Sequence, residues 1–211
     1  MDWLVSAGLL LSTLLLFKIQ KISDAVGIIA FQSALLALVA AMMWYKTGLT
    51  HLLLAAGLTF AVKTVMIPAI LFYTIHKTNA KQVAERTSSP HVSLFLATLL
   101  LVAGYYVAGH LKLPGTEHGE YYLSTSIMLI FLGTFTMIEH KKAIMQAIGL
   151  IVIENGLFLV TQSISYGMPL AVEMGIFFDL LVSAAVIAVL AFRIHSNFAS
   201  LNTEKMQNLK G

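Results

Sequence analysis

The stretch IVIENGLFLV, residues 151–160, holds a single carboxylate, Glu154, in a run that is otherwise uncharged and mostly apolar. The run extends from about 142 to about 165, which exceeds the roughly 20 residues that a helix needs to cross a hydrocarbon core. At 1.5 Å per residue, Glu154 lies about 18 Å from the start of such a helix. The stretch therefore predicts a membrane-spanning helix with a glutamate near its midpoint.

The composition of the whole chain is typical of a protein that crosses a membrane several times. Of its 211 residues, 58% are hydrophobic and 11% are charged, whereas soluble domains carry about 25% charged residues. The absence of cysteine excludes disulfides, thiolate-bound metals and iron–sulfur clusters in this chain. Its seven histidines lie at the ends of apolar segments or in loops, where they do not suit haem ligation. No nucleotide-binding loop, catalytic triad or zinc motif is present, so the sequence predicts no active site, no cofactor and no nucleic-acid contact within this chain.

Seven segments are long and apolar enough to form membrane-spanning helices. They cover residues of about 2–17, 25–45, 50–75, 91–110, 121–138, 142–165 and 169–193. Polar or turn-forming loops separate them, of which HKTNAKQVAERTSSP, residues 76–90, is the longest. Because backbone amides in lipid must be hydrogen-bonded within the protein, helices are the expected structure. The predicted fold class is an all-α polytopic integral membrane protein with seven transmembrane helices.

Lysine and arginine are distributed unevenly between the two sides of this predicted bundle. One side holds ten of them, and the other side holds only Lys46 and Lys112. The side that is rich in basic residues is expected to face the cytoplasm, so the N-terminus is predicted outside and the C-terminus inside. The ten residues are Lys18, Lys21, Lys77, Lys81, Arg86, Lys141, Lys142, Arg193, Lys205 and Lys210.

The 76–90 loop is the one boundary that the sequence suggests. It divides an N-terminal transmembrane part, residues 1–90 with the first three spans, from a C-terminal transmembrane part, residues 91–195 with the last four. Residues 196–211 are predicted to form a short cytoplasmic tail.

Three ionisable residues are predicted to lie at one depth. Glu154 is about 18 Å from the inner surface, and Asp179 and Lys63 are about 15 Å and 20 Å from the outer surface. A charge near the midplane costs about 2.5–3.5 kcal/mol on insertion scales, so such residues pair, neutralise or line a hydrated cavity. Two readings stay open: a structural ion pair between helices, and a path for protons or cations.

Helical periodicity assigns neighbours to these charges. Thr161 follows Glu154 by seven positions and shares its face, while Gly149 and Gly156 lie on roughly the opposite face. Small residues let membrane helices approach closely, so the glycine face is predicted to pack against another helix and the Glu154 face to look into a polar seam.

The third span has a similar polar stripe, which includes Thr59 and Lys63. Pro68 follows Lys63 by five positions, and because proline lacks an amide hydrogen, it predicts a helix kink with a freed carbonyl at Thr64. Glu173, near the outer mouth of the last span, is either an access residue for ions or an interfacial charge.

Three stretches resemble a known family. QAIGLIVIENGLFL (146–159), VEMGIFFDLLVSAAVIAVL (172–190) and FAVKTVMIPAILFY (60–73) resemble hydrogenase-4 component E, from the formate hydrogenlyase type of membrane-bound hydrogenase complex. The last three spans also look like the K subunit of respiratory complex I and the C subunit of multi-subunit Na⁺/H⁺ antiporters. In those subunits two buried carboxylates form part of a polar axis, and Glu154 matches the first. Asp179 matches the second, although it is an aspartate here and stands closer in sequence.

The resemblance implies a complex I-related assembly. Its soluble arm carries a nickel–iron (NiFe) hydrogenase and iron–sulfur proteins, and its membrane arm, in the inner membrane of a prokaryote, carries antiporter-like subunits. This chain would be a membrane-arm subunit whose Glu154, Asp179 and Lys63 move protons or cations, or couple that movement to electron transfer.

Two alternatives remain at this point: a purely structural subunit that bridges antiporter-like neighbours, and a subunit of a hydrogenase-free cation/proton antiporter. The sequence leaves open whether H⁺ or Na⁺ moves and whether formate, ferredoxin or carbon monoxide supplies the electrons.

Overall fold

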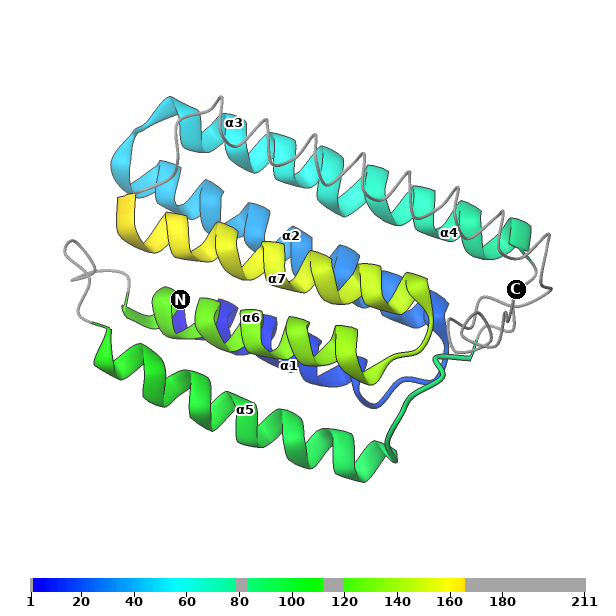
Figure 1. Ribbon diagram of the computed structural model, residues 1–211. Coiled ribbons are helices and arrows are strands. Elements are labelled where there is room, and N and C mark those ends of the chain that lie inside the picture. Colours follow the sequence, from blue (N-terminus) through cyan, green and yellow to red (C-terminus); the bar gives the residue numbers. More distant parts are fainter. Residues whose placement is uncertain (1, 79–82, 112–119, 166–211) are drawn as a thin grey trace, which may run out of the picture.

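The computed structural model describes residues 2–78, 83–111 and 120–165. These residues form long helices that lie side by side (Figure 1). The elements are α1 (Asp2–Leu16), α2 (Ile22–Thr47), α3 (Thr50–Leu58), the π-helix η1 (Thr59–Met66), α4 (Ile67–Thr78), α5 (Pro90–His110), α6 (Glu120–Glu139) and α7 (Ala143–Ser165).

Five of these helical rods are long and apolar enough to cross a membrane, and α1 is a shorter apolar helix. One rod consists of α3, η1 and α4 in succession. The first six predicted spans agree with the observed helices to within a few residues, which supports an all-helical membrane protein. The predicted seventh span, 169–193, and the tail, 196–211, lie outside the described residues, and the predicted orientation stays a prediction.

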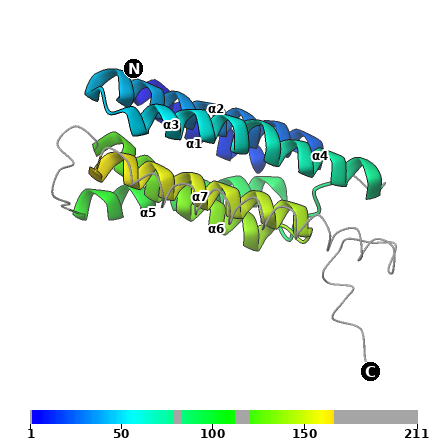
Figure 2. The ribbon, with the colours of Figure 1, turned by 90° about the horizontal axis from the view of Figure 1, so that it is seen from above.

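The helices form two layers. Figure 2 shows α1 to α4 in one layer and α5 to α7 in the other. The α2 helix contacts α1, α3, η1, α4 and α7, and the most extensive helix pair is α6 with α7. Because α2 joins the two layers, polar residues on α2 can reach side chains from both.

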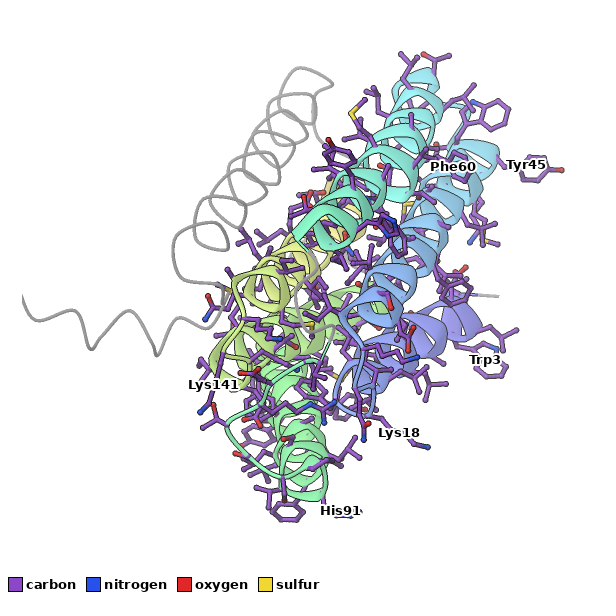
Figure 3. The ribbon with its side chains drawn as sticks, turned by 90° about the vertical axis from the view of Figure 1, so that its right-hand side faces the viewer. Trp3, Lys18, Tyr45, Phe60, His91 and Lys141 are labelled. Carbon is purple, nitrogen blue, oxygen red and sulfur yellow. The ribbon has the colours of Figure 1, made fainter. Side chains whose placement is uncertain are left out.

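Large apolar side chains cover the outside of the bundle. Trp3, Tyr45 and Phe60 are 61%, 86% and 53% exposed, and Trp3 and Tyr45 project away from the helices in Figure 3. Apolar surface of this kind marks contact with a membrane or a partner protein, which agrees with a protein embedded in lipid.

Glycines bring α6 and α7 close together. A Cβ atom placed on Gly149 would lie 2.8 Å from the carbonyl oxygen of Gly133 and 2.6 Å from Cγ of Met137. A Cβ atom on Gly156 would lie 2.8 Å from the carbonyl oxygen of Ser126. The prediction that the Gly149–Gly156 face packs closely against another helix is confirmed, and the partner is α6.

Three loops meet at one end of the bundle. They are residues 17–21, 83–89 and 140–142. The Ala84 amide donates to the Gln20 carbonyl (2.6 Å), and the Thr87 amide donates to the Glu139 carbonyl (2.9 Å). We call this the basic end, because the loops carry Lys18, Lys21, Arg86, Lys141 and Lys142. Lys18 and Lys141 are labelled in Figure 3, which looks onto this end.

The η1 segment departs from α-helical geometry next to a proline. The Ile67 amide, which closes η1, donates to the Val62 carbonyl five residues back, the π-helical pattern. Pro68 is the next residue and has no amide hydrogen to donate. The kink at Pro68 stays a prediction, and the structure adds a π-helical segment directly before it.

Candidate functional site

An ion pair joins η1 to α7 inside the bundle. The ammonium of Lys63 contacts the carboxylate of Glu154 directly, and the side chains are 0% and 11% exposed. Lys63 lies in the interior of η1, and Glu154 lies at the twelfth position of α7. The structure thus brings together two of the three ionisable residues that the sequence placed at one depth.

An aromatic ring completes the surroundings of the lysine. The Nζ atom of Lys63 lies 5.5 Å from the centroid of the Phe158 ring, within the range of a cation–π interaction. Phe158 follows Glu154 by one helical turn, so one face of α7 supplies both the anion and the ring. A cation held by both groups is better stabilised than by either alone.

Two threonines flank the pair. Thr59 lies one turn before Lys63 in η1, is fully buried, and its hydroxyl has no hydrogen-bond partner among the described residues. Thr161, one turn beyond Phe158, is partly buried and donates to the Phe158 carbonyl (2.7 Å). Their positions match the two polar stripes expected from the sequence. A role for either residue in ion movement stays a prediction.

The other predicted site residues are placed differently. Pro68 lies at the second position of α4, one turn beyond the ion pair. Asp179 and Glu173 lie outside the described residues. Within the part of the chain that is described, no cluster of three or more His, Asp or Glu side chains could hold a metal ion.

A buried chain of hydrogen bonds beside the ion pair was not predicted. Asn155, which follows Glu154, donates from Nδ2 to Oε1 of Gln32 (2.9 Å), and Gln32 donates from Nε2 to the hydroxyl of Thr13 (2.7 Å). All three side chains are fully buried. We call Thr13, Gln32 and Asn155 the amide bridge; it joins α1, α2 and α7.

The sequence carried a signal for this bridge. Gln32 is the one amide side chain in the predicted span 25–45, and Asn155 stands next to the predicted glutamate. Uncharged polar residues in membrane helices commonly hydrogen-bond across helices. The sequence-based candidates are the ionisable residues and the threonines that share their helical faces, and this choice misses the amides.

The arrangement allows one proton to be held in two ways. With the proton on Nζ, Lys63 and Glu154 are ionised and attract each other across low-dielectric surroundings. With the proton on the carboxylate, both groups are neutral and need no counter-charge. Because each form is tolerated in an apolar interior, the pair can change its charge distribution without leaving a single buried charge.

Comparisons with known proteins find relatives that match the chain along nearly its whole length. The chain is 24% identical to hydrogenase-4 component E of Escherichia coli K12, over 97% of this chain and 95% of that protein. The Shigella flexneri protein of the same name gives the same values. The chain is also 26% identical to the uncharacterized protein Rv0085 of Mycobacterium tuberculosis, over 97% of this chain and 94% of that protein.

No family model and no solved structure matches the chain. The resemblance to hydrogenase-4 component E that was predicted from the sequence is confirmed by the full-length similarity. The likeness of the last three spans to the complex I K subunit stays a prediction.

Proposed function

We propose that this chain, which is similar to hydrogenase-4 component E along nearly its whole length, is a membrane subunit of a hydrogenase-type complex in a prokaryotic inner membrane. Antiporter-like and complex I-like membrane subunits are its neighbours. Nickel–iron and iron–sulfur clusters belong to other subunits, and electrons do not pass through this chain.

The proposed role is proton or cation translocation, or its coupling to electron transfer. The buried contact between Lys63 and Glu154 is the observation that carries this role. Electron transfer in a neighbouring subunit changes the local electric field, and a pair with an ionised and a neutral form responds by moving its proton. Asp179 is then a further carrier on the same path, and Glu173 gives access to it.

A structural role is the second candidate, and the same contact supports it. A buried lysine and glutamate in direct contact also hold η1 and α7 in register. Replacing a buried ion pair by apolar or neutral residues of similar volume is often neutral for stability, whereas removing one partner costs about 3–5 kcal/mol. A variant that removes both charges can therefore keep its structure, and its ion translocation then distinguishes the relay from the structural role.

The test uses the double variant Lys63→Met with Glu154→Gln, compared with each single variant in the assembled complex. We expect the double variant to assemble better than either single one, because it leaves no unpaired charge. Two rates are then measured in membrane vesicles: electron transfer to a viologen dye, and ion translocation per electron.

A subunit that relays protons loses translocation in the double variant while assembly persists. Full translocation by the assembled double variant contradicts the relay and leaves the structural role. Lys142→Gln with Glu85→Gln is the matched control, because Lys142 and Glu85 also form an ion pair (3.5 Å) but in the loops of the basic end.

A further inference from the structure

Buried polar atoms continue beyond the amide bridge toward the end of the bundle opposite the basic end. Ser6 precedes Thr13 by seven positions on α1, and Gln162 follows Asn155 by seven positions on α7. Seven positions return to nearly the same helical face and advance by about 10.5 Å. The two helices run in opposite directions (Figure 1), so Ser6 and Gln162 lie in the same direction from the bridge, at a similar level.

These residues are buried and their polar atoms lack partners. Ser6 and Gln162 are 6% and 1% exposed. Among the described residues, nothing hydrogen-bonds to the Ser6 hydroxyl or to either polar atom of the Gln162 amide. In the bridge itself, Oδ1 of Asn155 is likewise without a partner in the described part of the chain.

Partnerless buried polar groups are unfavourable, by about 1–3 kcal/mol each. Buried water, which makes about three hydrogen bonds, is the usual remedy where several such groups lie along one seam. The seam formed by α1, α2 and α7 presents four such atoms on three side chains. The groups are a hydroxyl, a carbonyl oxygen and a complete amide, which together can both donate to and accept from water.

The line of polar groups reaches the end of the bundle. There Lys46 donates to the Asp2 carboxylate (3.1 Å), and Tyr122 hydrogen-bonds to the same carboxylate. Polar groups thus extend from the level of Glu154 through the bridge and the Ser6–Gln162 level to charged side chains at the surface.

We propose that ordered water fills this seam and connects the Lys63–Glu154 pair to the end of the bundle that carries Asp2. Its hydration follows from the buried polar atoms alone. Its use as the path by which protons reach Glu154 from that side rests on the proposed function. Gln32 accepts a hydrogen bond from Asn155, the residue next to Glu154, and so orients the amide by which α7 contributes to the seam.

The test detects water next to single sulfur atoms. The chain has no cysteine of its own, so each introduced thiol is the only one in it. Ser6→Cys and Gln162→Cys are prepared in the full complex, and X-ray radiolysis generates hydroxyl radicals from water inside the protein. Mass spectrometry then measures oxidation of each thiol, so no reagent has to enter the seam.

Ala40→Cys is the matched control. Ala40 is fully buried on α2 and lies eight residues beyond Gln32, about 12 Å in the same direction. We expect the Ser6→Cys and Gln162→Cys sulfurs to oxidise about tenfold or more faster than the Ala40→Cys sulfur, because oxidation follows access. Equal, slow oxidation at all three positions overturns the proposal.

Two further measurements distinguish hydration of the seam from a failure to assemble and from a loss of translocation. Ser6→Cys changes only one oxygen to sulfur, so it decides the result if Gln162→Cys does not assemble. Oxidation does not depend on translocation: fast oxidation together with full pumping in the Lys63→Met and Glu154→Gln double variant supports a hydrated seam and contradicts only the proton relay.

Discussion

Burial of Lys63 is tolerated because its ammonium meets the Glu154 carboxylate and the Phe158 ring together. Depth estimates along the sequence placed Lys63, Glu154 and Asp179 at one level, but depth does not choose partners. The choice depends on which helices are neighbours and on their rotation, which the π-helical segment around Lys63 changes. That segment has no signature in hydrophobic periodicity, so the pairing could not be derived from the sequence.

At the residue scale, the buried side chain of His140 is expected to make the stability of the chain depend on pH. Burial disfavours the imidazolium and lowers the pKa of His140 below its usual 6.5; the Arg86 charge acts in the same direction, against the Thr136 carbonyl and Glu139. Nδ1 donates to the Thr136 carbonyl (2.9 Å), but burial is the larger effect and favours the neutral ring. As the pH falls below about 6.5, the unfolded chain binds a proton that the folded chain does not, and stability decreases until the folded pKa is reached.

Thermal unfolding of the solubilised complex at about pH 8 and about pH 5 measures this effect. His140→Gln is expected to reduce the loss of stability on acidification, whereas His110→Gln, on the exposed face of α5, leaves the loss unchanged. The same acid sensitivity in the wild-type chain and the His140→Gln variant would exclude His140 as its source.

At the element scale, the α6–α7 pair depends on the absence of side chains at its glycines. Carbonyl oxygens occupy the space that a Cβ atom would need, 2.8 Å from the Cβ position at both Gly133 and Gly156. The periodicity of Gly149 and Gly156 predicted this close approach, because seven-residue spacing of small residues is visible in a sequence. The sequence did not indicate which helix packs against these glycines.

Gly149→Ala is expected to destabilise the chain by about 1–3 kcal/mol, the usual effect of overpacking. The new methyl group would meet Met137 and the backbone of Gly133, and α6 can move away only by losing its other contacts with α7. Gly57→Ala is the control, since no described atom lies within 4 Å of its Cβ position and alanine favours the helix by about 0.5–1 kcal/mol. Unfolding in mixed detergent compares the two, and equal stability of both variants would contradict close packing.

At the scale of the whole molecule, predicted spans and observed helices agree where the length of an apolar segment determines the helix. The predicted span 91–110, for example, corresponds to the helix Pro90–His110. The arrangement in two layers was not predicted. Lipid and apolar side chains are similar surroundings for a helix, so hydrophobicity does not specify which helices meet. Specific polar contacts supply that information here, in the amide bridge between α1, α2 and α7 and in the loops of the basic end.

Arg86 is the side chain expected to hold the two layers together at the basic end. Its guanidinium donates to the carbonyls of Phe17 and Ile19, just beyond α1, and its backbone pairs with His140 between α6 and α7. Arg86→Lys keeps the charge but loses the planar fork that reaches both carbonyls, so we expect a loss of about 1.5–3 kcal/mol. Lys18→Gln, an exposed change at the same end, should have little effect. Thermal unfolding compares the variants; an Arg86→Lys variant as stable as Lys18→Gln would mean that the layers are held elsewhere, by the amide bridge and the Lys63–Glu154 pair.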